Sequence, residues 1–255
     1  MSTLVNAADV LKLIAKLRSD ITVTDVVTHL GLAKSSASRT LSMMAEYGFL
    51  ERDSVSRAYR PGAVVMEASY HFRASHTALT LLQGVLDKLV GETGYTGYIN
   101  VLDGADSVVI QMRTGAGSLQ VYTPPGSRAP AYASSIGRAI LSRLTDEEVT
   151  ALVQDGFEVR RGNIQRTRKD LLARLKEARE TGWALSRGEF VQNVAGISAA
   201  LRDPTTRQIY GLGIAMPVQD LTDAMVQRFG ARIVEATSDA GRQIGDPYWL
   251  AFAPR

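Results

Sequence analysis

The spacing of the apolar residues changes near Gly94, and this change limits the possible folds more than any other feature of the sequence. Before Gly94, apolar residues recur at helical spacing in several segments, among them residues 4–18, 63–76 and 77–93. After it, β-branched and aromatic residues fill short segments bounded by turn residues. Helices and hairpins are mixed without a regular strand–helix–strand alternation. We therefore expect an α+β protein with a largely antiparallel sheet.

The segments after Gly94 supply the expected elements of a second, larger domain. Strands are expected over residues 95–102, 107–113, 118–124, 183–187, 194–202 and 207–218. Helices are expected from Ser134 or Ser135 to about residue 144, and over residues 145–153, 167–181 and 220–244.

Residues 22–60 have the spacing of two short helices followed by a hairpin. Thr22 can cap a helix that runs to Leu30, and Gly31 ends that helix in a tight turn. A second helix is expected over residues 34–47, and two short strands over residues 49–52 and 57–60. We therefore predict a winged helix-turn-helix domain over residues 1–61, a linker helix over residues 62–76 and a second domain over residues 77–255.

The second helix of this motif has one apolar and one polar face. Ala37, Leu41 and Met44 share the apolar face. In a helix-turn-helix the second helix lies in the major groove of DNA, where serine, arginine and lysine bind phosphates or base edges. The hairpin is a candidate wing. The candidate DNA-binding residues are Thr22, Lys34, Ser35, Ser36, Ser38, Arg39, Ser42, Arg57 and Tyr59. The alternative is an ordinary antiparallel helix pair with a solvated polar face.

The sequence lacks the residue patterns of the common catalytic sites. Cysteine is absent, which excludes thiol nucleophiles, disulfides and cysteine-ligated metals. Residues 133–137 approach a nucleophile elbow but lack its first glycine, and all three histidines precede them. Gly-Lys does not occur, and the glycines at 211 and 213 fall within an expected strand, so neither common phosphate-loop motif is present. We predict no catalytic residue, no cofactor and no metal site.

No segment is expected to cross a membrane. The longest uncharged run, residues 114–127, has 14 residues and contains glycine and proline, whereas a spanning helix needs about 20 apolar residues. The N-terminus lacks the features of a signal peptide. The expected location is therefore the cytoplasm, and the pI of about 9.2 is compatible with a polyanionic partner.

Two motifs in separate domains resemble those of one protein family. Residues 30–41 (LGLAKSSASRTL), followed by Tyr47-Gly48-Phe49-Leu50, resemble the recognition-helix segment of the IclR-type bacterial transcription regulators. Residues 128–141 (RAPAYASSIGRAIL) are similar to the loop-plus-helix signature of the same family. Residues 171–182 with Glu189, and then residues 197–203 and 209–217, follow the closing pattern of the family.

This resemblance implies a winged helix-turn-helix domain, a linker helix used in dimerisation and a GAF-like effector-binding domain. The implied function is a ligand-responsive transcription regulator that binds double-stranded operator DNA as a homodimer or a dimer of dimers. The alternative function is a metabolite-binding protein or an enzyme that carries an accessory winged helix. Chemical turnover of a bound ligand would favour that alternative.

A candidate effector site lies at the start of the helix expected near Ser134. The hydroxyls of Ser134 and Ser135 and the first unpaired backbone N–H groups converge there, an arrangement that receives a carboxylate. A small organic or aromatic acid is the expected ligand, although both serines can also serve only as caps. By resemblance, the residues that line the site are Tyr132, Ser134, Ser135, Ile136, Gly137, Glu189, Ile197, Ala199, Gly213 and Ala215.

The sequence departs from the family pattern at two positions of this site. The usual Ala-Ala-Pro-Val run appears as Ala199-Ala200-Leu201, without the proline, and Tyr132 stands where the family often has histidine. Both changes alter the expected pocket, so the ligand of a relative is not transferred to this chain.

Overall fold

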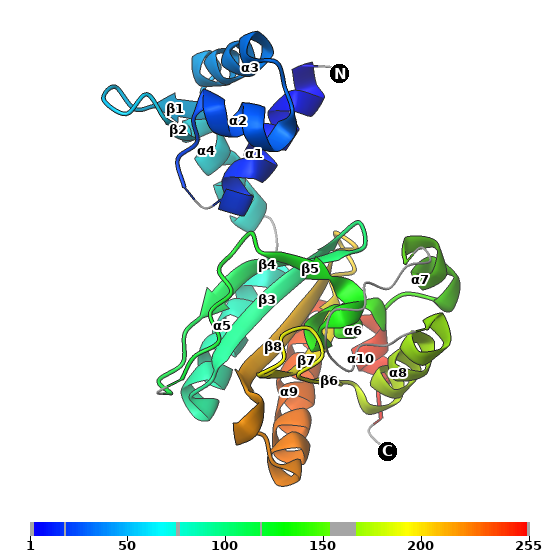
Figure 1. The fold of residues 1–255 in the computed structure, drawn as a ribbon. Coiled ribbons are helices and arrows are strands. Elements are labelled where there is room, and N and C mark those ends of the chain that lie inside the picture. The colour runs from blue at the N-terminus through cyan, green and yellow to red at the C-terminus, as the bar shows by residue number, and fades with distance from the viewer. Residues whose placement is uncertain (1–2, 18, 75–76, 118, 154–166, 254–255) are drawn as a thin grey trace. The chain divides into compact units, whose positions relative to one another are not determined.

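A computed structural model describes residues 3–17, 19–74, 77–117, 119–153 and 167–253 (Figure 1). The chain divides into two compact units, Met1–Ser75 and His76–Arg255, and each is described separately. The first unit is helical with a small hairpin, and the second combines an antiparallel sheet with helices. The expected α+β class is confirmed.

The first unit contains the elements expected of a winged helix-turn-helix. Helices α1 (Thr3–Leu17), α2 (Val23–Leu30) and α3 (Lys34–Glu46) precede an antiparallel pair of strands, β1 (Leu50–Arg52) and β2 (Tyr59–Pro61). Helix α4 (Ala63–Ala74) follows and covers most of the segment expected as a linker, whose residues 75 and 76 lie outside the described part of the chain. The core contains Val10, Ile21, Val26, Leu41 and Leu50.

Helix α2 begins and ends as the sequence predicts. The Thr22 hydroxyl accepts from the Asp25 N–H at 3.3 Å, and the Asp25 carboxylate accepts from the Thr22 N–H at 2.7 Å, which together form a capping box. The Thr22 hydroxyl also donates to this carboxylate at 2.7 Å. These bonds lower the pKa of Asp25. Gly31 ends the helix with a left-handed φ of 66°.

Replacing Thr22 with alanine is expected to lower the free energy of unfolding by about 1 kcal/mol at pH 7. Because the pKa of Asp25 is lowered in the folded protein, the ionised Asp25 carboxylate stabilises the folded state at neutral pH. This contribution to the free energy of unfolding is lost as the pH falls through the folded pKa. The difference between wild type and variant should therefore shrink in acid. Urea unfolding at several pH values measures it, with Thr24→Ala, an exposed position of the same helix, as the control. An equal loss in both variants would contradict the assignment.

The second unit is built on a six-stranded antiparallel sheet in the order β5-β4-β3-β8-β7-β6. Its strands are β3 (Thr96–Asp103), β4 (Asp106–Arg113), β5 (Arg128–Pro130), β6 (Ala184–Arg187), β7 (Val194–Arg202) and β8 (Ile209–Pro217). β3 and β8 are paired from Thr96 opposite Ala215 to Val101 opposite Tyr210, which brings the first hairpin of the domain beside the last one.

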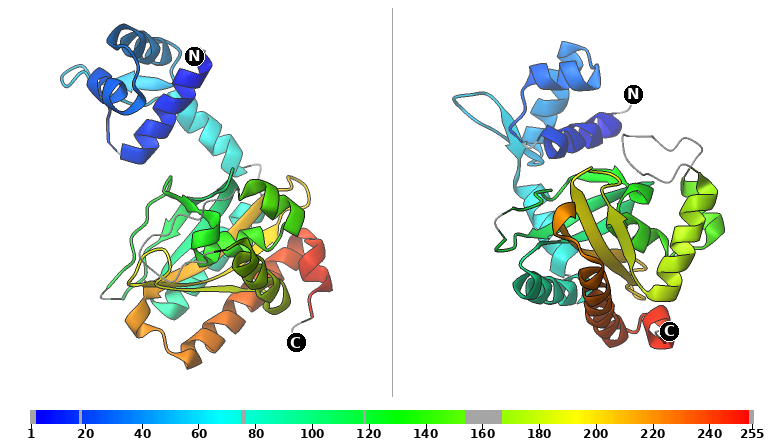
Figure 2. Two further views of the ribbon diagram at one scale, coloured as in Figure 1. Left: turned by 45° about the vertical axis from the view of Figure 1, so that its right-hand side comes forward. Right: turned by 60° about the horizontal axis from the view of Figure 1, so that its bottom comes forward.

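The two faces of this sheet are covered by different helices. Helices α5 (Thr77–Thr93) and α9 (Asp223–Ile244) pack on one face, where the largest apolar cluster includes Leu82, Ile99, Ile197, Leu212 and Phe229. Figures 1 and 2 show α6 (Ser135–Leu141), which follows a short turn at Ala131–Ala133, on the opposite face. Helices α7 (Asp146–Leu152) and α8 (Arg168–Thr181) lie on the same side as α6.

Three expectations for this unit were wrong. Residues 119–124 form no strand, and Ser118 lies outside the described part of the chain. The prolines at 124 and 125 cannot donate to a ladder, and the edge partner of β4 is β5 instead. Helix α6 ends at Leu141, before residue 144, and α9 begins at Asp223, after a turn over Val218–Asp220.

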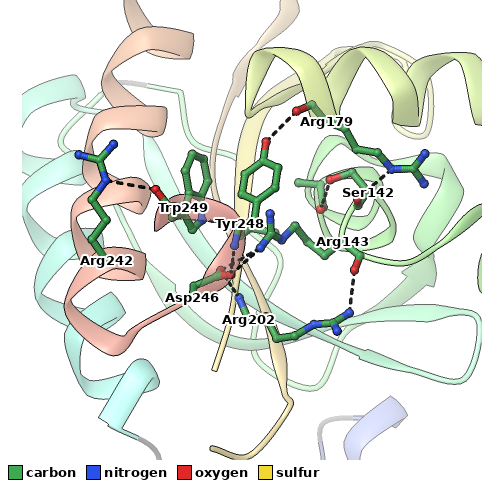
Figure 3. Close-up of polar contacts among 10 residues, drawn as sticks. Ser142, Arg143, Arg179, Arg202, Arg242, Asp246, Tyr248 and Trp249 are labelled. Carbon is green, nitrogen blue, oxygen red and sulfur yellow. Dashed lines mark hydrogen bonds and ion pairs between the residues drawn. The ribbon is translucent and has the colours of Figure 1, made fainter. Parts of the chain in front are cut away.

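A short helix, α10 (Pro247–Ala251), was not predicted and is held by polar contacts shown in Figure 3. The buried Asp246 carboxylate accepts from Nη2 of Arg143 at 2.8 Å and from the Arg202 N–H at 2.8 Å. The Arg143 guanidinium lies 3.6 Å from the Tyr248 ring centroid. The indole N–H of Trp249 donates to the Ala200 carbonyl at 3.0 Å. We call residues 246–249 the C-terminal latch, because they join the turn after α6, strand β7 and helix α9.

Candidate nucleic-acid interface and ligand cavity

Helix α3 presents a polar face away from the core of the first unit. Its apolar face is buried through Ala37, Leu41 and Met44. Each of the predicted DNA-binding residues of this helix is exposed: Lys34, Ser35, Ser36, Ser38, Arg39 and Ser42. The exposed face therefore carries small hydroxyl groups that permit close approach to DNA. Lys34 and Arg39 lie on the same face, about a turn and a half apart.

The N-terminus of α3 is not capped by any described side chain. Ala33 occupies the cap position and forms no side-chain hydrogen bond, whereas α2, α8 and α9 are capped by Thr22, Thr167 and Thr222. The first backbone N–H groups of a helix have no partner inside the helix, and the helix dipole favours an anion there. This end of α3 is suited to a phosphate.

The β1–β2 hairpin places one predicted residue outward and buries another. Arg57 lies in the exposed turn with a φ of 62°, a conformation that few non-glycine residues adopt. The Asp53 carboxylate supports this turn by accepting from the N–H groups of Val55 and Ser56. Tyr59, expected at the interface, is instead only 1% exposed, because the strand directs its ring into the core beside Ile21. It is not a DNA-binding candidate.

The lysine and arginine side chains of this unit differ in whether they already form an ion pair or a hydrogen bond. Arg60 is paired with Asp53 at 2.8 Å, and Arg52 donates to the Arg57 carbonyl. Within the described part of the chain, the side chains of Lys34, Arg39 and Arg57 form no hydrogen bond or ion pair. The hydroxyl of Thr22, also a predicted contact, is engaged in the cap of α2. Of the cations predicted to contact DNA, those on α3 and at the hairpin tip are therefore available.

The second unit contains a cavity of about 170 Å³ between the sheet and the N-terminus of α6. Polar side chains from distant segments contribute to its wall, and no carboxylate is present among the described residues that line it. Arg128, which is paired with Asp103 at 2.7 Å, lies at its exposed edge. The polar lining residues are Tyr98, Asn100, Ser107, Thr123, Ser127, Arg128, Ser134, Ser135, Ser186 and Ser198. Such a wall favours an uncharged or anionic ligand.

Gly196 and Gly213 lie among the residues that line the cavity. A Cβ at Gly213 would overlap the Ser198 hydroxyl, and one at Gly196 would lie 2.6 Å from Oγ of Ser135. Gly213, Ala215 and Gly196 line the cavity, as do the residues at the start of α6, Ser134, Ser135 and Ile136. The space exists because β7 and β8 carry no large side chains on this face.

The two serines of α6 have different roles. The Ser134 hydroxyl accepts from the Gly137 N–H at 3.2 Å and caps the helix. Ser135 is 5% exposed, and its Oγ lies 2.8 Å from Oγ of Ser198 on β7. One of the two hydroxyls donates its hydrogen to the other. The hydrogen of the second hydroxyl is then free to be donated to a ligand.

Two predicted strand positions face away from the cavity. Side chains alternate along a strand, so Gly196 and Ser198 face the cavity, whereas Ile197 and Ala199 belong to the apolar cluster under α5 and α9. The expected segment of β7 was correct, but Ile197 and Ala199 were the wrong positions within it.

Three further predicted residues support the cavity without lining it. The Glu189 carboxylate is 5% exposed and pairs with Arg138 at 2.6 Å and with Arg174 at 2.8 Å, so it joins α6 to α8. Tyr132 is buried in a separate apolar cluster with Leu141 and Leu171. Gly137 allows close packing of α6, since a Cβ there would overlap the backbone of the preceding turn.

The cavity residues missed from the sequence include Tyr98 and Asn100 on β3 and Ser107 on β4. Asn100 is 4% exposed, and its Nδ2 donates to Oγ of the buried Ser107 at 2.9 Å. The Tyr98 hydroxyl donates to the Val121 carbonyl, and burial raises the pKa of this hydroxyl. The available signal was polar residues at alternate positions of an otherwise apolar strand, Thr96-Gly-Tyr-Ile-Asn100.

The described residues hold no group of three or more histidine, cysteine or acidic side chains placed to bind a metal ion. Across the described ranges, no helix has the length and apolar character needed to span a membrane.

Known proteins resemble the chain along almost its whole length. The model of the family described as "Bacterial transcriptional regulator IclR C-terminal" matches residues 74–244, and that of the IclR helix-turn-helix domain matches residues 3–54. The HTH-type transcriptional regulator XynR of Escherichia coli (strain K12) is 25% identical over 243 residues, 94% of this chain and 96% of the relative.

Solved structures share the fold. That of an IclR transcriptional regulator from Alicyclobacillus acidocaldarius has a TM-score of 0.83 at 19% identity and covers 94% of this chain and 97% of its own. That of an IclR homolog from Microbacterium hydrocarbonoxydans, complexed with 4-hydroxybenzoate, has a TM-score of 0.77 at 21% identity, with 96% and 99% covered.

Proposed function

The chain belongs to the IclR family of bacterial transcriptional regulators, and from this premise we propose that it binds operator DNA as a dimer and is switched by a small carboxylic acid. Its relatives are named as transcriptional regulators or repressors rather than enzymes. The proposal includes the cytoplasm as the location, because the operator is found there.

The exposed face of α3 is the observation that carries the DNA-binding part. In the proposed complex α3 lies in the major groove, with the Lys34 ammonium and the uncapped helix N-terminus on a phosphate. Arg39, about a turn and a half further along the helix, bonds a base edge, most favourably guanine. Arg57 at the hairpin tip contacts the backbone or the minor groove. Ser35, Ser36, Ser38 and Ser42 supply further hydrogen bonds.

The modest charge of the motif supports binding as a dimer. Residues 32–60 contain Lys34 and four arginines against Glu46, Glu51 and Asp53, so one copy neutralises few phosphates. Two copies that bind half-sites about one helical turn apart double the contacts. A dimer of dimers extends the same arrangement.

The cavity wall supports an acid as the ligand. The described lining residues supply hydroxyls, an amide and the Arg128 guanidinium but no carboxylate, and a structural relative is complexed with 4-hydroxybenzoate. An acid that binds two dimer arrangements unequally shifts the population between them, and thereby the affinity for the operator.

An anisotropy titration of the full-length protein tests the proposal. The labelled duplex is selected from random DNA by the protein itself, and a scrambled duplex serves as the competitor at fixed salt. We expect tighter binding to the selected duplex and a change in that affinity when an acid of the 4-hydroxybenzoate type is added. Equal affinity for both duplexes would overturn the DNA-binding part, and an affinity that no acid changes would overturn the ligand part.

Replacing Arg39 with alanine is expected to weaken binding to the selected duplex by about 1–3 kcal/mol, the usual contribution of a base-contacting arginine. Affinity for scrambled DNA should fall much less. The same titration measures both. Arg228→Ala removes the same charge from an exposed position of α9 and is the control. An equal loss in the two variants would assign the effect of Arg39 to net charge alone.

A further inference from the structure

Asn100 carries a buried polar atom that lacks a partner in the described residues. Its side chain is 4% exposed and lines the cavity, and Nδ2 donates to Ser107, but Oδ1 has no hydrogen-bond partner. An unpaired buried acceptor costs about 1–3 kcal/mol. Because Oδ1 lies on the wall of a cavity, a ligand that donates a hydrogen bond to it removes this free-energy cost on binding.

The chemistry of the amide identifies the group that the ligand supplies. The two orientations of an asparagine amide have the same shape. In one, Oδ1 faces the cavity; in the other, Oδ1 accepts from the Ser107 hydroxyl and Nδ2 faces the cavity. A hydroxyl both donates and accepts, so it pairs with Asn100 in either orientation.

The strand register places this group opposite the Ser135–Ser198 pair. Asn100 on β3 is opposite Gly211 on β8, and Ser198 on β7 is opposite Gly213 of the same strand. The two polar pairs therefore lie on either side of β8, with about 10 Å between the backbones of β3 and β7. Both pairs line the same cavity, and Gly213 between them carries no side chain, so one ligand can extend from one pair to the other.

We propose that Asn100 and Ser107 form a hydroxyl-binding subsite, and that the ligand is a compact hydroxycarboxylic acid with its carboxylate at Ser135 and Ser198. The cavity volume of about 170 Å³ sets its size, because an engineered cavity of about 150 Å³ holds one benzene molecule. A single ring or a chain of similar bulk fits. This inference rests on the proposed acid-binding function and adds the second polar end of the ligand.

Calorimetry on the full-length protein with matched acids tests the inference. The probes are benzoate with 3- and 4-hydroxybenzoate, and butyrate with 3-hydroxybutyrate. At least one hydroxylated acid should bind about tenfold more tightly than its parent, the worth of one hydrogen bond to a buried group. Equal binding of each pair would overturn the subsite but leave acid binding intact. Binding of none of these acids would overturn the proposed acid ligand as well.

Variants separate the two ends of the ligand. Asn100→Val keeps a similar volume and suits a strand, and it should reduce the ratio between hydroxylated and parent acid to about one without changing the affinity of the parent. Ser198→Ala should weaken both acids equally. Asn100→Ala repeats the test if the valine variant fails to fold, and Gln227→Ala, an exposed amide on α9, should change nothing. Equal weakening of both acids by Asn100→Val would overturn the assignment.

Discussion

Replacement of Asp246 with alanine is expected to lower the free energy of unfolding of the second unit by about 3–5 kcal/mol. The carboxylate is 1% exposed and pairs with Arg143, whose side chain is 6% exposed. Its removal leaves a buried guanidinium without its counter-charge and also removes the cap of α10. Urea unfolding followed by circular dichroism measures the loss.

Two further variants isolate the cause. Asp87→Ala removes an exposed carboxylate that pairs with Arg113 at 2.7 Å, and it should cost less than about 1 kcal/mol. Asp246→Asn keeps an acceptor for the Arg202 N–H, so its loss in the free energy of unfolding should lie between those of the two alanine variants. If Asp246→Ala costs no more than Asp87→Ala, the C-terminal latch contributes little to stability.

Replacement of Gly213 with alanine is expected to weaken acid binding about a hundredfold while DNA binding is retained. The new methyl group overlaps the Ser198 hydroxyl, so it breaks the pair with Ser135 and occupies part of the cavity. Overpacking costs about 1–3 kcal/mol, and each 1.4 kcal/mol corresponds to a factor of about ten in affinity. Calorimetry with 4-hydroxybenzoate or another acid that the wild type binds measures the change.

Gly84→Ala is the matched control for this substitution. It adds the same methyl group to an exposed position of α5, where a Cβ meets nothing within 4 Å. Acid binding should be unchanged, and the helix should become slightly more stable. The double variant Gly213→Ala, Ser198→Gly should recover part of the affinity because space returns. Wild-type affinity in Gly213→Ala would place the ligand elsewhere.

The elements that the sequence predicts well are those whose ends are fixed by local chemistry. The capping boxes at Thr22 and Thr145 and the left-handed glycines at 31 and 182 lie where the helices start and stop. Helix α10 was missed because a five-residue helix gains little from its own hydrogen bonds. It depends on Asp246 and Trp249, whose partners come from the turn after α6 and from β7.

The cavity could be predicted only in part because its wall joins distant segments. Ser134, Ser135 and Ile136 were found because they are consecutive at a helix start. Asn100 and Ser107 were missed because their position beside that helix depends on the pairing of β3 with β8. Tyr59 was selected for its chemistry and Glu189 by family resemblance. The burial of Tyr59 in the core and of Glu189 in an ion pair follows from packing that the sequence does not display.

The division of the sheet into an apolar face and a polar, glycine-containing face affects how ligand specificity can change during evolution. Mutations at Asn100, Ser135, Ser198 or Gly213 alter the cavity, whereas the cluster beneath α5 and α9 is formed by other side chains of the same strands. A lineage can therefore exchange one signal molecule for another by small steps, and each intermediate keeps a folded protein with its DNA-binding unit intact.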